Sequence, residues 1–292
     1  MRYSLVTDGW HIAIRKGAIG QILNDTVTPF IIIKNGFSYW VADPFLFEYD
    51  NDLYIFVEYM DYHTLTGCIA YTKYNETNHN VKWYKVIEEP FHMSFPFIYR
   101  DGEDIYMLPE TSQAGALYRY KCERFPDVWK RETIMKDVMF ADTALLDNYS
   151  HGYTLDVSDD SMRKAVTFSF DGGVVKDVKF YSDDAKTCRL GGAFFRYNGY
   201  DIKVSQDCEK EYGKSLIFST FNWTNNEEKV IKNLTIEEVN TIGKINKIHG
   251  VHTYNSAGGY EIIDLKTNRI NIVEVIARLI RKVSKVFKLE RL

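Results

Sequence analysis

A hairpin pattern recurs five times along the chain, and it constrains the fold more than any other feature of the sequence. Each copy has three or four apolar or aromatic residues, a turn of Asp, Asn, Gly or Ser, a second alternating run, and then a carboxylate. The copies cover residues 39–58, 94–110, 141–156, 191–207 and 251–264. Their equivalent positions are Pro44, Pro96, Thr143, Gly192 and His252, at spacings of 52, 47, 49 and 60 residues. Repeats of this length are typical of the blades of a β-propeller.

Two more strands can be read after each of the first four hairpins, over residues 67–74 and 81–89 in the first repeat, which gives four strands to a blade. The fifth repeat has only its hairpin before the sequence becomes helical at about Ile270. Its missing strands are expected from the N-terminal segments 3–6, 10–16 or 29–34, because these would close the ring and leave no exposed edge. A single blade cannot bury both of its faces, so the sequence predicts one all-β, five-bladed β-propeller over residues 1–268.

Hairpin geometry predicts that the carboxylates of the repeats share one rim of the ring. In an antiparallel hairpin the start of the first strand and the end of the second lie together, so Asp43, just before its strand, and Glu58, just after the next, are expected at the same end. The same rule places Glu110, Asp142, Asp156, Asp207 and Asp264 on that rim. Carboxylates gathered at one mouth repel one another and raise some of their pKa values, which provides an acid and a base at neutral pH. Alternatively, Glu58, Asp156 or Asp264 caps a turn or accepts backbone hydrogen bonds between blades.

Three segments carry a resemblance to known propellers: "ADPFLFE" from Ala42, "EEPFHMSFPFIYRDGEDIYMLPET" from Glu88 and "FADTALL" from Phe140. They resemble the five-bladed superfamily of arabinanases, β-xylosidases, invertases and levansucrases. With "SQDCEKEYGKSLIF" and "HGVHTYN", the chain is more similar to the propeller domain of glucosamine inositolphosphorylceramide transferase-like proteins. The resemblance covers about residues 38–265 and implies a carbohydrate-active propeller.

The resemblance implies three catalytic carboxylates. Asp43 matches the acid that serves as base or nucleophile in the hydrolases, and Asp142 matches a second acid that stabilises the transition state. Glu110 is the candidate general acid, although the hydrolases' own acid motif is not recognisable here. Asp142 is followed by Thr143 where the pattern has proline. Glycosyl transfer passes through an oxocarbenium-like state that such carboxylates stabilise.

Further polar residues near the strand ends are candidates for substrate binding. Arg189 is suited to holding a phosphate or a carboxylate bidentately, or else it pairs with a rim acid. Histidines near the axis suit a metal, but no third ligand stands at a diagnostic spacing, so neither a metal nor another cofactor is expected. The substrate-binding candidates are Glu58, His92, Arg189, Gln206, Asp207, Tyr212, His249 and His252.

The C-terminal residues 269–292 differ from the repeats. Apolar residues from Ile272 to Phe287 follow helical spacing, and six basic residues lie between Arg278 and Arg291. Such an amphipathic helix either lies on an anionic membrane surface or docks on the propeller or on a second subunit.

Composition narrows the possible functions. The net charge of −4 argues against a nucleic-acid groove, which needs a concentrated basic face. The four cysteines form no C-x-x-C pair, so zinc and redox motifs are absent; two disulfides remain an alternative to reduced thiols. No signal-peptide core or membrane-spanning stretch is read, which favours the cytoplasm.

These observations favour a glycosyltransferase at the inner membrane face, making a capsule or other surface polysaccharide or a glycolipid. Its expected partners are a sugar donor, with a nucleotide-activated furanose as one candidate, and a glycan acceptor. The alternatives are a glycoside hydrolase acting on furanosides or pentosides, and a non-catalytic propeller that binds glycan or protein.

Overall fold

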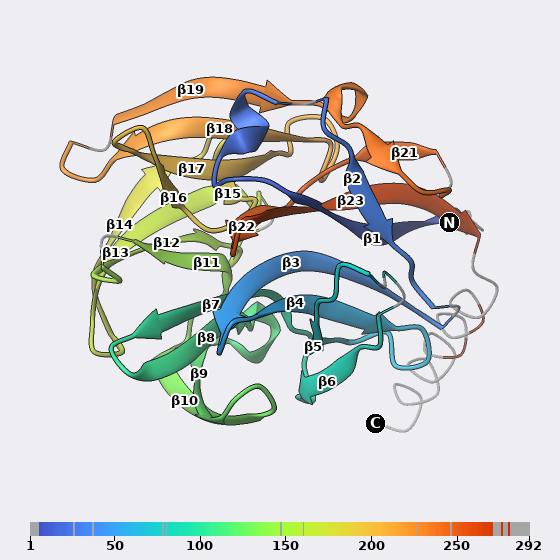
Figure 1. Ribbon diagram of the computed structural model, residues 1–292. Coiled ribbons are helices and arrows are strands. Elements are labelled where there is room, and N and C mark those ends of the chain that lie inside the picture. Colours follow the sequence, from blue (N-terminus) through green and yellow to red (C-terminus); the bar gives the residue numbers. More distant parts are fainter. Residues whose placement is uncertain are drawn as a thin grey trace.

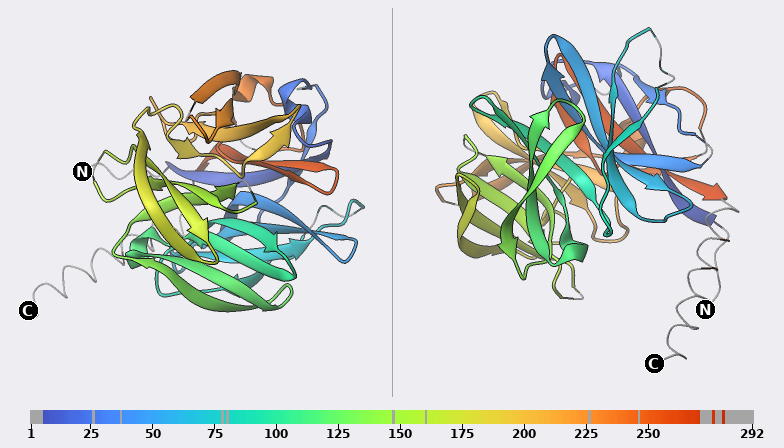
Figure 2. Two further views of the ribbon diagram at one scale, coloured as in Figure 1. Left: turned by 90° about the vertical axis from the view of Figure 1, so that its left-hand side faces the viewer. Right: turned by 90° about the horizontal axis from the view of Figure 1, so that it is seen from below.

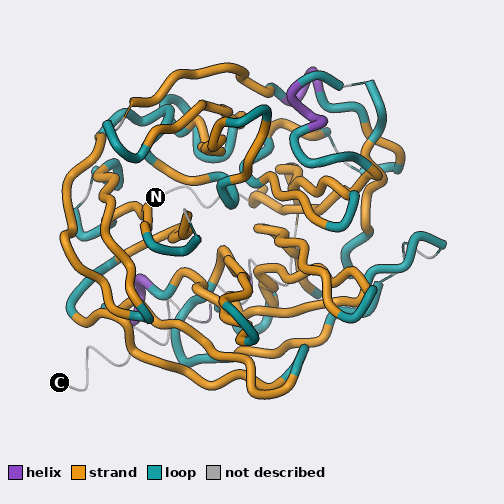
Figure 3. Tube along the Cα trace, turned by 60° about the vertical axis from the view of Figure 1, so that its left-hand side comes forward, coloured by secondary structure: helices purple, strands orange, loops and turns teal. Residues whose placement is uncertain are grey.

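The computed structural model describes residues 6–270, except positions 26, 37, 78, 80, 147, 160, 226 and 246, together with Ile276 and Ile280. Five sheets are arranged in a ring around a central axis (Figures 1 and 3). Three short 3₁₀ turns interrupt the loops: η1 (Gln21–Leu23), η2 (Ser112–Ala114) and η3 (Ile236–Glu238). The prediction of an all-β, five-bladed β-propeller is confirmed.

The first four blades follow one another along the chain as antiparallel sheets. Blade 1 has β3 (Tyr39–Tyr49), β4 (Asp52–Asp61), β5 (Gly67–Lys73) and β6 (Tyr84–Ile87). Blade 2 has β7 (Ser94–Asp101), β8 (Asp104–Glu110), β9 (Ala116–Arg124) and β10 (Val128–Lys136). Blade 3 has β11 (Phe140–Leu146), β12 (His151–Asp156), β13 (Lys164–Asp171) and β14 (Val174–Ser182). In blade 4, β15 (Arg189–Leu190) and β16 (Phe195–Tyr197) both pair with β17 (Tyr200–Asp207), and β18 (Ser215–Asn222) and β19 (Glu227–Leu234) follow.

The fifth blade joins the two ends of the chain. Its strands are β21 (Ile248–Gly250), β22 (Tyr254–Ala257), β23 (Tyr260–Ile270), β1 (Val6–Lys16), β2 (Phe30–Ile33) and β20 (Thr241–Ile242). β1 pairs with β23 along its whole length, from Val6 opposite Ile270 to Lys16 opposite Tyr260. Figure 2 shows the two strands side by side. The expected closure by the N-terminal segment is confirmed: segments 10–16 and 29–34 supply β1 and β2.

A buried ion pair between Arg15 of β1 and Glu261 of β23 stabilises this closure. The Arg15 Nη2 to Glu261 Oε2 distance is 2.6 Å, with side chains 2% and 0% exposed. The Glu261 carboxylate also accepts hydrogen bonds from the Tyr254 hydroxyl (2.7 Å) and the Ile22 amide (2.8 Å). Buried charges are tolerated only where they are paired and hydrogen-bonded in this way.

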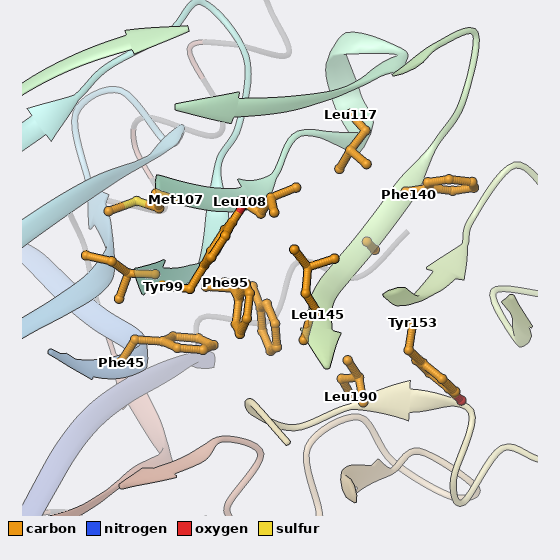
Figure 4. Packing of buried hydrophobic residues seen from close by; sticks show 14 of the residues in the cluster. Phe45, Phe95, Tyr99, Met107, Leu108, Leu117, Phe140, Leu145, Tyr153 and Leu190 are labelled. Atoms are coloured by element: carbon orange, nitrogen blue, oxygen red, sulfur yellow. The ribbon is translucent and has the colours of Figure 1, made fainter. Parts of the chain in front are cut away.

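The hydrophobic core lies between neighbouring blades. Its largest cluster draws buried aromatic and aliphatic side chains from blades 1 to 4. Figure 4 shows Phe95 and Tyr99 of blade 2 close to Leu145 of blade 3. Each sheet therefore buries its apolar residues against the next sheet, which is why the repeated hairpins need the closed ring.

The innermost strands of blades 1, 2 and 3 share a bulge. Asp43, Phe95 and Asp142 have φ angles of 49°, 46° and 49°, and the pairing register shifts at each of these positions. A bulge leaves one extra residue unpaired and lets the strand continue beyond it. The prediction that Asp43 and Glu58 flank the hairpin was therefore wrong in detail: β3 begins at Tyr39 and β4 ends at Asp61, so both acids lie inside strands.

The expected start of a helix at residue 269 was wrong, because Arg269 and Ile270 are the last residues of strand β23. The rest of that segment lies outside the described residues, apart from Ile276 and Ile280, whose side chains are exposed. β23 itself runs to Ile270. Within the part of the chain that the structure describes, no helix is long and apolar enough to span a bilayer.

Candidate functional site

Acidic side chains from four blades converge at one end of the central axis. Asp43 and Asp142 come from the bulges of β3 and β11, whereas Glu58 and Glu110 come from the second strands of blades 1 and 2, and Asp264 from β23. Asp43, Glu58, Asp142 and Asp264 are nearly inaccessible, with exposed fractions of 5%, 6%, 2% and 0%. The structure thus brings together all three predicted catalytic carboxylates, and Asp264 with them.

Asp43 ties blade 1 to both of its neighbours. Its Oδ2 accepts a hydrogen bond from the Phe95 amide (3.1 Å), and its Oδ1 accepts one from the Thr253 hydroxyl (2.7 Å). The Asp43 amide donates to Asp264 Oδ2 (3.1 Å). Burial, together with the charges of Asp142 and Asp264, raises the pKa of Asp43. Asp264 therefore has the interblade role considered from the sequence, and Asp43 has the same role, beside any chemical role.

His252 sits against both of these acids. Its Nδ1 lies 2.6 Å from Asp264 Oδ2, and its Nε2 lies 3.8 Å from Asp43 Oδ1. Trp10 of β1 stacks on the imidazole at 3.8 Å between ring centroids, and Tyr212 meets it edge-on at 5.3 Å. Burial opposes the charged form of His252, but Asp264 and Asp43 outweigh it and raise the pKa of the imidazole.

Asp43, His252 and Asp264 also form a donor set for a metal ion, because their ligand atoms lie within 4.8 Å of one another. The spacing of these residues in the sequence did not reveal the set. All four carboxylate oxygens already accept hydrogen bonds or contact His252, so the cluster is satisfied by the protein itself.

Arg189 joins two of the predicted catalytic acids. Its Nε donates to Asp142 Oδ2 at 2.5 Å, and its Nη2 lies 3.9 Å from Glu110 Oε2. The Tyr212 ring lies 5.0 Å from the guanidinium carbon, and the Gln206 amide contacts Asp142 at 3.4 Å. Burial raises the pKa of Asp142 to about 6, because Arg189 offsets only part of the cost of burying its charge. Of the two roles expected for Arg189, this structure has it pairing with rim acids.

Glu58 and His92 form a second pair at this end. His92 Nδ1 accepts a hydrogen bond from the Gly67 amide (2.9 Å), so its Nε2 carries the proton, and this Nε2 lies 3.3 Å from Glu58 Oε1. Burial, followed by the nearby charges of Asp43 and Glu110, raises the pKa of Glu58 well above its ordinary value. Burial lowers the pKa of His92, which keeps the imidazole neutral.

Family comparison gives this arrangement a context. Residues 8–258 match the family described as glucosamine inositolphosphorylceramide transferase 1, N-terminal. The chain belongs to this family. This agrees with the resemblance read from the repeat segments.

Curated relatives in this transferase family come from plants. The chain is 28% identical over 223 residues to glucosamine inositolphosphorylceramide transferase 1 of Arabidopsis thaliana. The aligned region covers 71% of this chain and 29% of that protein. The protein of the same name from Oryza sativa subsp. indica is 25% identical over 232 residues, covering 74% and 31%. The chain thus spans about three tenths of the length of these relatives.

Glycoside hydrolases are among the solved structures that resemble this family member. The catalytic domain of the GH62 α-L-arabinofuranosidase of Coprinopsis cinerea superposes with a TM-score of 0.60 at 9% identity, over 77% of this chain and 90% of that domain. A GH62 hydrolase in complex with xylotriose gives 0.58 at 10% identity, over 82% and 95%. At these identities the likeness shows a shared fold.

Other predicted residues lie apart from the central acids. Asp156 pairs with Lys164 (2.8 Å), Asp207 accepts a hydrogen bond from the Glu209 amide (3.0 Å), and His249 contacts Glu211 (3.7 Å). Within the described residues, no hydrogen bond or ion pair joins these three to a central carboxylate. Trp10 was missed because it lies in the closing strand, outside the repeats; the expectation that this segment completes blade 5 was the one signal that could have led to it.

The opposite end of the axis has a different character. A cavity of about 190 Å³ lies there, lined by the far ends of the innermost strands, including Phe45, Phe97, Tyr99 and Phe194. The ring therefore has one acidic end and one aromatic end.

Proposed function

We propose that this propeller performs glycosyl-transfer chemistry at its acidic end, in the synthesis of a surface polysaccharide or a glycolipid. The observation that carries the proposal is the convergence of Asp43, Glu58, Glu110 and Asp142 around Arg189 and His252. An oxocarbenium-like transition state requires one ionised carboxylate to stabilise its charge and one protonated acid for the leaving oxygen, and contrasting environments keep two carboxyl groups in these different states. The names of the plant relatives support a transferase acting on a lipid-linked acceptor.

The environments of the acids favour different roles. Asp43 accepts two hydrogen bonds and lies beside His252, which suits a fixed carboxylate that stabilises positive charge at the sugar. Glu58 holds its proton at higher pH than a free glutamic acid, which suits a proton donor to the leaving oxygen. Glu110, the candidate acid from the sequence, is held by the hydroxyls of Ser94 (3.2 Å) and Ser112 (2.7 Å) beside Arg189.

The nature of the donor bears on Arg189. When a nucleotide-activated sugar is transferred, the leaving group is a nucleoside phosphate, and the guanidinium suited to hold that phosphate is engaged by Asp142 and Glu110. A nucleotide donor therefore requires Arg189 to exchange an acid for the phosphate. A glycoside donor, whose leaving group is an alcohol, needs no such exchange. This observation favours the second candidate, a hydrolase or transglycosylase of furanosides or pentosides.

The position of the C-terminal segment supports an acceptor at a membrane. β23 continues for six residues beyond Asp264, roughly 20 Å of strand, and ends at Ile270 on the acidic side of the ring. Six basic residues follow in the sequence, between Arg278 and Arg291. We propose that they contact the inner, anionic face of the cytoplasmic membrane, which would hold a lipid-linked acceptor close to the carboxylates.

The deciding experiment incubates the purified chain with a panel of nucleotide sugars and glycan acceptors, and separately with aryl furanosides and pentosides, read by mass spectrometry. Acceptor-dependent donor consumption supports the transferase, and release of free sugar supports the hydrolase. Asp43→Asn and Glu58→Gln should each lower either activity at least about 100-fold, since a group that stabilises transition-state charge and a general acid each contribute that much. Binding of glycans without turnover by the wild-type chain would leave the propeller as an accessory module of a larger enzyme.

A further inference from the structure

A small basic pocket lies in the outer part of blade 5, away from the acidic cluster. Its volume is about 260 Å³, and it is lined by His11, Lys34, Asn35, Lys244 and Ile245. This is below the roughly 300–1,000 Å³ of pockets that enclose drug-sized ligands, so it suits a small group.

The strand pairing explains why these residues meet. β2 runs antiparallel to β1 with Ile33 opposite Ile12, so Lys34 and Asn35 continue past His11 and Trp10. β20 runs parallel to β2, with Ile31 opposite Ile242, so Lys244 follows along the same edge. The Asn35 amide donates to the Trp10 carbonyl and lies 3.4 Å from His11 Nδ1, which fixes the loop after β2.

The charge of this pocket is unbalanced. Lys34 and Lys244 are exposed, and neither forms an ion pair with any described residue. No carboxylate is among the five lining residues. At the acidic end, by contrast, Arg189 is held between Asp142 and Glu110. In a chain of net charge −4, two lysines that line one pocket without an acid mark a site for an anion.

We propose that this pocket binds a phosphate group, carried either by a lipid headgroup or by a soluble phosphorylated sugar or polyol. Two lysine ammonium groups match the double negative charge of a phosphate monoester, and the His11 imidazole adds a further polar group to the wall. A single carboxylate would leave one ammonium uncompensated.

The pocket also adjoins the candidate site through one strand. His11 lines the pocket, and the preceding residue, Trp10, stacks on His252 among the acids. Phosphate binding itself needs no turnover, so it is tested independently of the proposed glycosyl transfer.

The test compares the full-length wild-type chain with Lys34→Gln/Lys244→Gln. The matched control is Lys130→Gln/Lys136→Gln, which removes two exposed lysines from β10 in blade 2. Binding of inorganic phosphate and of glycerol 3-phosphate is followed by calorimetry at low ionic strength. Wild type and control should bind saturably, with affinities within about twofold of each other. The pocket variant should bind at least about tenfold more weakly than wild type, because charge-assisted hydrogen bonds to the phosphate are lost.

Vesicles distinguish the two sources of phosphate. The three proteins are sedimented with phosphatidylcholine vesicles, with and without phosphatidic acid. Loss of affinity in the pocket variant for the soluble esters identifies a soluble phosphorylated ligand, and a loss confined to phosphatidic acid vesicles identifies a lipid headgroup. The proposal is overturned if wild type binds none of these probes, or if the control variant loses as much affinity as the pocket variant.

Discussion

At the residue scale, two carboxyl groups at the acidic end keep their protons at pH values at which free carboxylic acids are ionised. Glu58 and Asp142 both have raised pKa values, that of Asp142 to about 6, because burial and neighbouring acids disfavour their charged forms. Between pH 4.5 and the native pKa, the unfolded chain releases these protons while the folded chain keeps them. Stability must therefore decrease as the pH rises through this interval.

The variant Glu58→Gln tests this dependence, because glutamine does not titrate. Its free energy of unfolding relative to wild type should rise with pH above about 4.5, by up to about 1.4 kcal/mol per pH unit. Urea denaturation at pH 5, 6, 7 and 8 measures the difference. Parallel curves for the two proteins would mean that Glu58 titrates alike in the folded and unfolded chains.

Gly67 is predicted to be required for the Glu58–His92 pair. A β-carbon at this position would lie 2.6 Å from His92 Cε1, 2.7 Å from the Met93 carbonyl oxygen and 2.9 Å from Glu58 Oε1. Gly67→Ala should therefore lower the free energy of unfolding by about 1–3 kcal/mol, as overpacking does. Since the Met93 oxygen belongs to the backbone, adding His92→Ala should not restore stability. Unchanged urea denaturation of Gly67→Ala would contradict the expectation.

At the element scale, the pairing of β1 with β23 closes the ring, and its buried ion pair should be worth more than a surface pair. Glu261→Gln leaves Arg15 buried without its carboxylate and should cost about 3–5 kcal/mol of unfolding free energy. The neighbouring exposed pair of Lys16 and Glu76, with side chains 70% and 49% exposed, provides the control. Glu76→Gln should cost less than about 1 kcal/mol.

A double variant separates the charge from the packing. Arg15→Met/Glu261→Gln should be less destabilised than the sum of its single variants, because neither charge is then left alone. Strictly additive losses in urea denaturation would show that the two side chains act independently.

The strands also show what the sequence could predict. The recurring hairpin was enough to place Asp43, Glu110 and Asp142 at one end. In an antiparallel hairpin the start of the first strand and the end of the second lie together, and this follows from the local sequence alone. The bulges were not predictable from that pattern. At Phe95 the backbone has the positive φ angle of the left-handed region, but phenylalanine is not a residue type that indicates such a conformation. The contact of Trp10 with His252 depends on closure between residues 242 positions apart, which no local pattern encodes.

At the scale of the whole molecule, the acidic end, the phosphate pocket and the end of β23 are linked by β1 and its partners. If the residues after Ile270 contact anionic lipid, a chain ending at Ile270 should lose most of its sedimentation with anionic vesicles. Six basic residues contribute about 1 kcal/mol each near such a surface, and binding of the full chain should weaken steeply with salt. Truncation at Ile270 keeps the pairing of β23 with Val6 intact. Equal sedimentation of both chains at low salt would contradict membrane contact by this segment.

The closure of blade 5 has a consequence for synthesis in the cell. β1 is synthesised before its partner β23, which is finished only about 250 residues later. At 5–20 residues per second, the nascent strand waits roughly 12–50 s for its partner. During that time the apolar residues of β1, such as Ile12 and Ile14, remain without their native cover. The nascent β1 is therefore exposed to chaperones on the ribosome during this interval, and the ring closes only after β23 has been made.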